Sequence, residues 1–146
     1  MEKYVKGIFK PRNPQKYKGN PTNIIYRSSW ELKMMSHFDG HPNIIWWQSE
    51  EVIVPYRSPI DNKIHRYYVD FHIQIKDKNN NIKTYLVEIK PSKQTVPPEF
   101  PGRKTKRYLE ESLAFIKNQS KWNAAKQYAK DRGWEFIIIT ERELGL

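Results

Sequence analysis

At 146 residues, the chain is long enough to form one domain with its own hydrophobic core. It has no cysteine, which excludes disulfides and thiolate zinc sites, and no apolar run approaches the roughly 20 residues of a membrane span. The net charge of +10 favours a phosphate-rich partner such as nucleic acid; the alternative is a basic surface that is merely solvated or packs on an acidic protein. Because the N-terminus is polar and basic, without the apolar segment of a signal peptide, we expect an intracellular protein.

Residues 1–22 are rich in lysine, arginine and proline, and we expect them to form a basic N-terminal arm. Pro11, Pro14 and Pro21 rule out a long helix in this segment. Such an arm either lies extended along DNA or is a frayed tail. We expect residues 23–146 to form a single domain.

A first helix is predicted over about residues 29–38, with Gly40 and Pro42 as stop signals. Glu31 lies on its inward stripe, because methionine and phenylalanine side chains follow it at helical spacing. Ser28 and Glu31 also have the spacing of a capping box, in which Glu31 would only satisfy the Ser28 amide. The spacing leaves both roles of Glu31 open.

Four β-prone runs follow, at residues 44–47, 52–56, 64–75 and 82–90. The run at 64–75 alternates cleanly, which predicts one face on the core and one on a polar cleft or water. Its apolar face carries Val69, Phe71, Ile73 and Ile75, and its polar face carries Arg66, Tyr68, Asp70, His72 and Gln74. His72 shares the face of Asp70 and is a lesser candidate for substrate contact.

The last two of these strands are predicted to form a hairpin, because a polar, asparagine-rich turn joins them. As antiparallel neighbours they bring Asp70 close to Glu88, and alternation puts Lys90 on the same face as Glu88. Two carboxylates and an ammonium suit a hard divalent cation and an activated water. The alternative is a solvated face with a cross-strand salt bridge.

Residues 91–107 are predicted to form a long loop, because four prolines and a glycine prevent regular structure. Four basic residues near its end are expected to hold a phosphate backbone near the carboxylates: Arg103, Lys104, Lys106 and Arg107, here called the basic cluster. The alternative is a mobile insertion.

Two helices are predicted next, over about residues 108–117 and 120–132, the second capped by a serine. Lys121 in the second helix is a further candidate for DNA contact, whereas Trp122 contacts either DNA or the core. The apolar run 134–139 is predicted as a buried strand, and a final turn of helix follows it. This order of elements suggests an α/β fold, a sheet flanked by helices.

Glu31 on the first helix, Asp70 on one strand and Glu88-x-Lys90 on the next resemble the PD-(D/E)xK nuclease superfamily, with Val69-Asp70 in place of Pro-Asp. Five segments in order, within residues 24–144, look like the head-completion nucleases of tailed phages. They are Arg27-Ser28-Ser29-Trp30-Glu31, Tyr68-Val69-Asp70-Phe71, Val87-Glu88-Ile89-Lys90-Pro91, Asn118-Gln119-Ser120-Lys121-Trp122-x-x-Ala125 and Phe136-Ile137-Ile138-Ile139-Thr140-Glu141. The nuclease subunit of heteromeric cut-and-paste transposases has a similar N-terminal domain.

The resemblance implies a restriction-endonuclease-like core, a central mixed β-sheet flanked by helices, and magnesium-dependent hydrolysis of DNA phosphodiesters. It implies that Asp70 and Glu88 ligate magnesium, with the Ile89 carbonyl as a further ligand. Glu31 would bind a second ion or a metal-bound water, and Lys90 would orient or activate the attacking water. Manganese is expected to substitute, and the expected product carries a 5′-phosphate and a 3′-hydroxyl.

The biological role implied by the resemblance is processing of packaged genome ends during phage head completion. The expected partners are double-stranded DNA and phage head or portal proteins, and no membrane. The expected location is the host cytoplasm or the virion. Two alternatives stay open: a nuclease subunit that cleaves transposon ends or junctions, and a non-catalytic DNA-binding protein of head closure. The residues leave the oligomeric state and the choice between single- and double-strand cutting undetermined.

Overall fold

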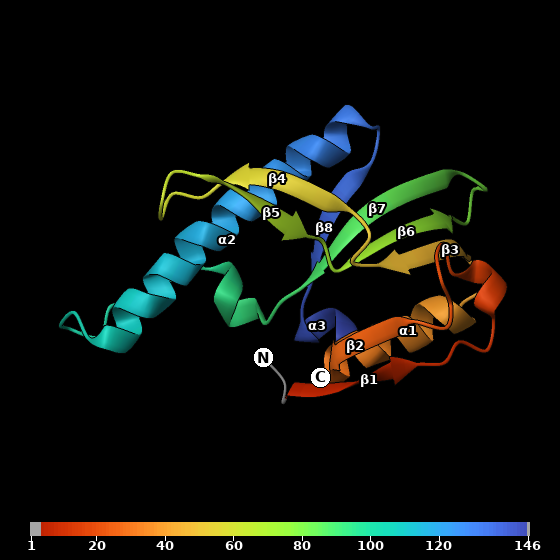
Figure 1. Cartoon of the computed structure of the whole chain (residues 1–146), viewed down its shortest axis with the longest axis horizontal. Helices are drawn as coiled ribbons and strands as arrows, with labels where there is room; N and C mark the ends of the chain where they lie inside the picture. Colours follow the sequence, from red (N-terminus) through yellow and green to blue (C-terminus); the bar gives the residue numbers. More distant parts are fainter. Residues whose placement is uncertain (1–3, 146) are drawn as a thin grey trace.

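The structure, a computed structural model, describes residues 4–145 (Figure 1). Its strands are β1 (Tyr4–Phe9), β2 (Ile24–Ser28), β3 (Ile44–Ser49), β4 (Ile53–Arg57), β5 (Ile64–Tyr68), β6 (Phe71–Lys76), β7 (Ile82–Ile89) and β8 (Glu135–Ile139). Its helices are α1 (Ser29–Gly40), α2 (Lys106–Asp131) and α3 (Glu141–Leu144), with single turns of 3-10 helix at Pro14–Lys16 and Ser92–Thr95. Within this part of the chain, no helix has the length and apolar character needed to cross a bilayer.

A four-stranded mixed sheet in the order β3-β6-β7-β8 forms the centre of the molecule. The strands β3, β6 and β7 are antiparallel, and β8 joins β7 in parallel after the α2 crossover. Alternate residues of β7 enter different hydrophobic clusters: Val87 and Ile89 pack on the α1 side, and Leu86 packs on the α2 side. Helices therefore flank both faces of the sheet, which confirms the expected α/β, restriction-endonuclease-like core.

The N-terminal segment belongs to the same fold. β1 pairs antiparallel with β2, the strand that leads directly into α1. Phe9 and Tyr17 are buried, and both rings pack edge-on against Trp47, which is fully buried. Over residues 4–22 the expectation of a free arm or frayed tail is therefore wrong, because apolar side chains between the prolines anchor the segment to the core. Residues 1–3 of the expected arm lie outside the described residues.

The strand predicted over residues 64–75 is in fact two strands that bend apart at Asp70. β5 pairs with β4 in a separate two-stranded sheet, whereas β6 enters the central sheet. Val69 packs in the cluster on the α2 side and Phe71 in the cluster on the α1 side, so the expectation that they share a face is wrong. The bend is held by two backbone bonds, from Val69 N–H to the Val52 carbonyl and from Glu50 N–H to the Asp70 carbonyl, each 3.1 Å.

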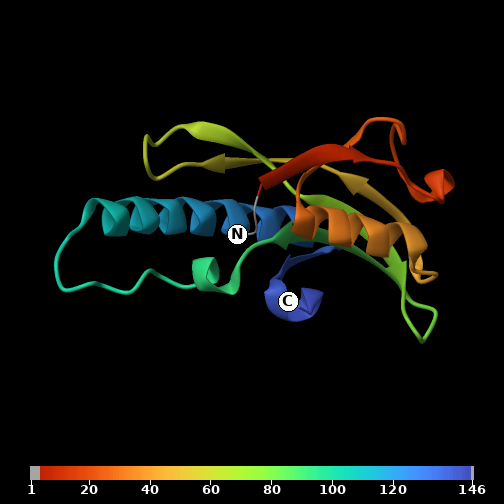
Figure 2. The same cartoon turned by 90° about the horizontal axis from the view of Figure 1, so that it is seen from below.

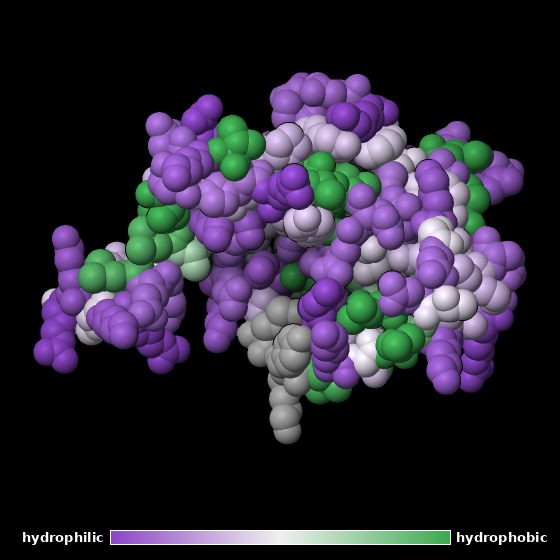
Figure 3. Space-filling model, in the orientation of Figure 1, coloured by the Kyte–Doolittle hydropathy of each residue, from purple (hydrophilic) through white to green (hydrophobic). Residues whose placement is uncertain are grey.

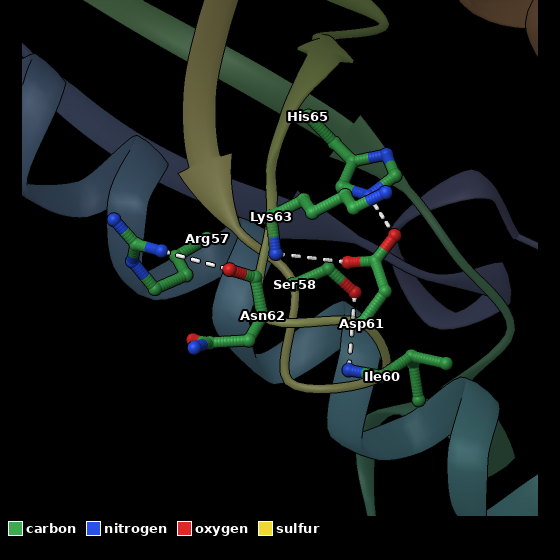
Figure 4. Close-up of polar contacts among 7 residues, drawn as sticks. All are labelled: Arg57, Ser58, Ile60, Asp61, Asn62, Lys63 and His65. Carbon is green, nitrogen blue, oxygen red and sulfur yellow. Dashed lines mark hydrogen bonds and ion pairs between the residues drawn. The ribbon is translucent and has the colours of Figure 1, made fainter.

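Polar groups of the backbone and side chains hold the turn between β4 and β5 (Figure 4). Asp61 accepts the Lys63 N–H at 3.0 Å, and its second oxygen lies 2.7 Å from His65 Nε2. Arg57 donates to the Asn62 carbonyl at 2.8 Å, and Asn62 adopts a left-handed φ of 57°. The hairpin is thereby held as a stiff two-stranded sheet, whose buried face packs on α2.

A single continuous helix, α2, replaces the two helices predicted over residues 108–132. Ser120 lies inside it, and the true N-cap is Thr105, whose hydroxyl accepts the Tyr108 N–H at 3.1 Å. The buried residues of α2, namely Trp122, Ala125 and Ala129, all lie in its C-terminal half. The N-terminal half and the loop before it extend away from the central sheet (Figure 2), and leave apolar surface exposed there (Figure 3).

Candidate active site

The antiparallel β6–β7 hairpin brings the predicted acidic residues together. Phe71 pairs with Val87, so the register places Asp70 opposite Glu88 at the point where β6 begins. Lys90 follows Glu88 by two residues, and its N–H continues the parallel ladder to the Ile139 carbonyl at 3.0 Å. Glu31 comes from the first turn of α1, and its charge raises the pKa of Asp70. Glu31, Glu88 and Lys90 therefore all act electrostatically on Asp70, which gathers the four expected catalytic residues around one place.

Asp70 and Glu88 form a pair of neighbouring carboxyl groups on adjacent strands. One oxygen of each has a protein donor: Ile89 N–H donates to Asp70 Oδ2 at 2.8 Å, and the Tyr67 hydroxyl donates to Glu88 Oε1 at 2.6 Å. Burial raises the pKa of both carboxyls, and the charge of Glu88 raises that of Asp70 further. A buried and a half-buried carboxylate that repel one another favour either a shared proton or a cation.

Two lysines face this pair. Lys90 lowers the pKa of both Asp70 and Glu88, opposing the effect of burial. Lys121, on α2, is half-buried with its Nζ 5.6 Å from the centre of the Tyr67 ring. Burial lowers the pKa of Lys121, whereas the charges of Glu88 and Asp70 raise it, so this ammonium lies beside the carboxylates. The sequence suggested that Lys121 contacts DNA, but it did not place this residue beside the carboxylates. The side chain reaches the site only because α2 packs there.

At Glu31 the structure shows the helix cap at Ser28, and the catalytic role of the carboxylate stays a prediction. The Ser28 hydroxyl accepts the Glu31 N–H at 3.1 Å, so Ser28 is the expected N-cap of α1. The Glu31 carboxylate, 3.3 Å from the same hydroxyl, also has a backbone hydrogen bond with Arg27. Burial raises the pKa of Glu31, and the charge of Glu50 raises it further. Its side chain is therefore anchored at the cap and still acts electrostatically on Asp70.

Glu50 and Tyr67 are two neighbours of the site that sequence reasoning did not single out. Glu50 pairs with Arg27 and has a left-handed φ of 56°, a strained conformation for a glutamate that is held next to Asp70. Tyr67 is buried, and its pKa is raised strongly by burial and by Glu88, so its hydroxyl stays protonated and donates. No local sequence pattern marks either residue, since both depend on contacts between distant segments.

His72 is not part of this site. It is buried between Trp46 and Trp134, with ring centres 4.8 and 4.4 Å away, and its Nδ1 lies 2.8 Å from Gln48 Oε1. Burial lowers its pKa to about 4, so the ring is neutral at physiological pH. The expectation of substrate contact is wrong for His72, because Trp46 and Trp134 pack against its ring and leave the residue only 5% exposed. Trp122 is likewise a core residue.

The donor set at the site fits magnesium. Within residues 4–145, no cluster of three or more histidine, aspartate or glutamate side chains has the arrangement of a metal site. Asp70 and Glu88 nevertheless present a close pair of oxygen donors, and the buried Ile89 contributes its N–H to hold Asp70. Magnesium keeps several of its waters and commonly uses only one or two carboxylates, so a pair with an outlying Glu31 is sufficient.

The basic cluster lies farther from the carboxylates than expected. Arg103 and Lys104 are exposed in the loop, and Lys106 and Arg107 form the first turn of α2. Arg107 pairs with Glu111 at 2.7 Å. Fourteen residues of helix separate Arg107 from Lys121, or about 21 Å along the axis. The loop thus carries the cluster outward, and the ammonium next to the site belongs to Lys121 instead.

Comparison with known proteins agrees with this geometry. Residues 41–141 match the family described as TnsA-like endonuclease N terminal, a range that contains Asp70, Glu88 and Lys90 and begins after Glu31. The chain is 39% identical over 139 residues to the Head completion nuclease of Enterobacteria phage T4, an alignment that covers 92% of this chain and 90% of that protein.

Proposed function

The chain belongs to the TnsA-like endonuclease family, and from this premise we propose that it is a magnesium-dependent endonuclease that hydrolyses DNA phosphodiester bonds. The observation that carries the proposal is the pair of a half-buried Asp70 and a buried Glu88 on adjacent strands, opposed by Lys90. The likeness to a nuclease over nearly the whole chain supports the reaction, and the paired oxygen donors support the metal.

Each side chain has a distinct task in this reaction. Asp70 and Glu88 would hold the magnesium ion, which supplies positive charge against the scissile phosphate and acidifies water. Lys90 orients the attacking water and stabilises the charge that develops on the phosphate oxygens. Glu31 positions a second water or ion from the start of α1. Water adds to phosphorus, the bond to the 3′ oxygen breaks, and the products carry a 5′-phosphate and a 3′-hydroxyl.

The substrate is proposed to lie along α2. Lys121 is next to the carboxylates, and the basic cluster is at the far end of the projecting half of the helix. The separation of about 21 Å corresponds to roughly six base pairs of duplex at about 3.4 Å each. A phosphate backbone held at both ends would offset the repulsion between DNA and the acidic site.

The biological role that we propose is processing of packaged genome ends, with phage head or portal proteins as partners, in the host cytoplasm or on the virion. The name of the T4 relative supports it. The family match favours a second candidate, cleavage at transposon ends or DNA junctions. Comparison of linear ends, transposon ends and branched junctions as substrates separates the two roles.

The test is cleavage of supercoiled and linear plasmid in magnesium, manganese, calcium or EDTA, with the product ends analysed. We expect cleavage in magnesium and manganese alone, and products that ligate without prior phosphorylation. Absence of cleavage of every substrate, together with negligible manganese binding in a calorimetric titration, would overturn the proposal in favour of a non-catalytic DNA-binding protein.

A further inference from the structure

A buried hydroxyl group donates to one of the two paired carboxylates. Tyr67 on β5 is only 4% exposed, packs in the same cluster as Trp122 of α2, and donates its hydroxyl proton to Glu88 Oε1 at 2.6 Å. This bond therefore connects the separate β4–β5 sheet with the central sheet at the candidate active site.

The chemistry of the two groups fixes the direction of this hydrogen bond. Burial and the charge of Glu88 raise the pKa of Tyr67, so its hydroxyl keeps its proton and donates it to the carboxylate, which accepts it. Glu88 Oε1 therefore receives its hydrogen bond from a fixed group of the protein in a buried place.

This bond decides which oxygen of Glu88 is available. Oε1 is held by Tyr67, so Oε2 is the oxygen left for other partners. Asp70 is held in the same manner, since its Oδ2 accepts the Ile89 N–H. Each carboxylate of this neighbouring pair thus has one oxygen held by a hydrogen-bond donor of the protein. The Tyr67 ring also lies under the Lys121 ammonium, so one residue places two groups of the site.

We propose that Tyr67 is a positioning residue of the nuclease site, whose hydroxyl holds Glu88 Oε1 so that the other oxygen of Glu88 faces Asp70 and a divalent cation. This inference rests on the proposed function and deepens it. Removal of a hydrogen-bond donor behind a metal ligand typically lowers metal affinity by about 10- to 100-fold. Tyr67 is therefore expected to affect metal affinity and kcat rather than the KM for DNA.

The decisive variant is Tyr67→Phe, which keeps the ring and its contact with Lys121 and removes only the hydroxyl. The matched control is Tyr56→Phe: Tyr56 is equally buried in the same cluster and also lies under Lys121, with Nζ 5.9 Å from its ring. Manganese affinity is measured by titration calorimetry, DNA cleavage by steady-state kinetics, and folding by circular dichroism and melting.

We expect Tyr67→Phe to bind manganese about tenfold more weakly or worse, and to regain part of its cleavage at high manganese concentration. Tyr56→Phe should behave as the unaltered chain in both assays. If Tyr67→Phe does not fold, Tyr67→Met, which also removes the hydroxyl and keeps an apolar side chain in the cluster, should show the same loss of manganese affinity.

Two results would overturn the inference in different ways. Unaltered manganese affinity and kcat in folded Tyr67→Phe would leave Tyr67 as an ordinary core hydrogen bond, while the proposed function stands on the activity of the unaltered chain. Absence of both manganese binding and cleavage in the unaltered chain would overturn the proposed function, and this inference with it.

Discussion

Replacement of Asp70 with asparagine is expected to abolish cleavage and, at the same time, to stabilise the metal-free protein at pH 8. The amide oxygen of asparagine can still accept the Ile89 N–H that now binds Asp70 Oδ2. The substitution therefore keeps the local hydrogen bond and removes one charge from the buried pair with Glu88. Fold and activity should respond in opposite directions, as expected of a residue retained for function at a cost in stability.

The raised pKa of Asp70 sets both the size of the stability gained by Asp70→Asn and its dependence on pH. Its causes are burial and then the charge of Glu88, so the folded chain holds this proton more tightly than the unfolded chain. The protonated Asp70 carboxyl contributes its full stability below the pKa that it has in the unfolded chain. This contribution is lost as the pH rises through the pKa that it has in the folded chain. Each unit of the shift costs about 1.4 kcal/mol, equivalent to about 3–6 °C in Tm for a domain of this length.

The assay is thermal melting in EDTA from pH 4 to pH 8, with plasmid nicking in magnesium. The Tm gain of Asp70→Asn should be near zero at about pH 4 and grow toward pH 8, and magnesium should reduce it by stabilising only the unaltered chain. Glu99→Gln, an exposed loop substitution with the same change of charge, is the control. An equal or lower Tm at pH 8 would refute the like-charge argument, and undiminished cleavage would refute the catalytic assignment.

Four further outcomes are expected. Lys90→Ala should reduce cleavage by about 100-fold or more and leave a folded protein; retained nicking would remove Lys90 from the mechanism. Glu31→Gln should keep or raise its Tm, since the Ser28 cap bond uses the backbone N–H of residue 31 and the pKa of the carboxylate it replaces is raised, and should lose cleavage by about 100-fold; normal cleavage would remove Glu31 from the mechanism. Alanine at all four positions of the basic cluster should weaken DNA binding in calcium for every DNA sequence. The slope of log affinity against log salt concentration should flatten by about 0.9 for each phosphate that is no longer neutralised. An unchanged slope would mean that the loop is a mobile insertion. Trp47→Ala should cost about 3–5 kcal/mol in urea unfolding, and a loss below about 1 kcal/mol would contradict its place in the core.

Local patterns in the sequence were enough to locate the acidic site. The asparagine-rich turn and the two-residue period of its flanking strands set the register that puts Asp70 opposite Glu88, because both are properties of neighbouring residues. Ser28 as the N-cap of α1 and Gly133 as the end of α2 were equally readable, since capping depends on one turn of chain. The α/β class follows from the order of such elements.

Contacts between distant segments decided the rest. The bend at Asp70 arises because β5 pairs with β4 while β6 enters the central sheet, and no property of residues 64–75 alone announces that change of partner. The N-terminal prolines suggested a free arm, yet Phe9 and Tyr17 bury their rings against Trp47 from another strand. The bond from Tyr67 to Glu88 joins positions that lie far apart in sequence, so only the packed tertiary structure reveals it.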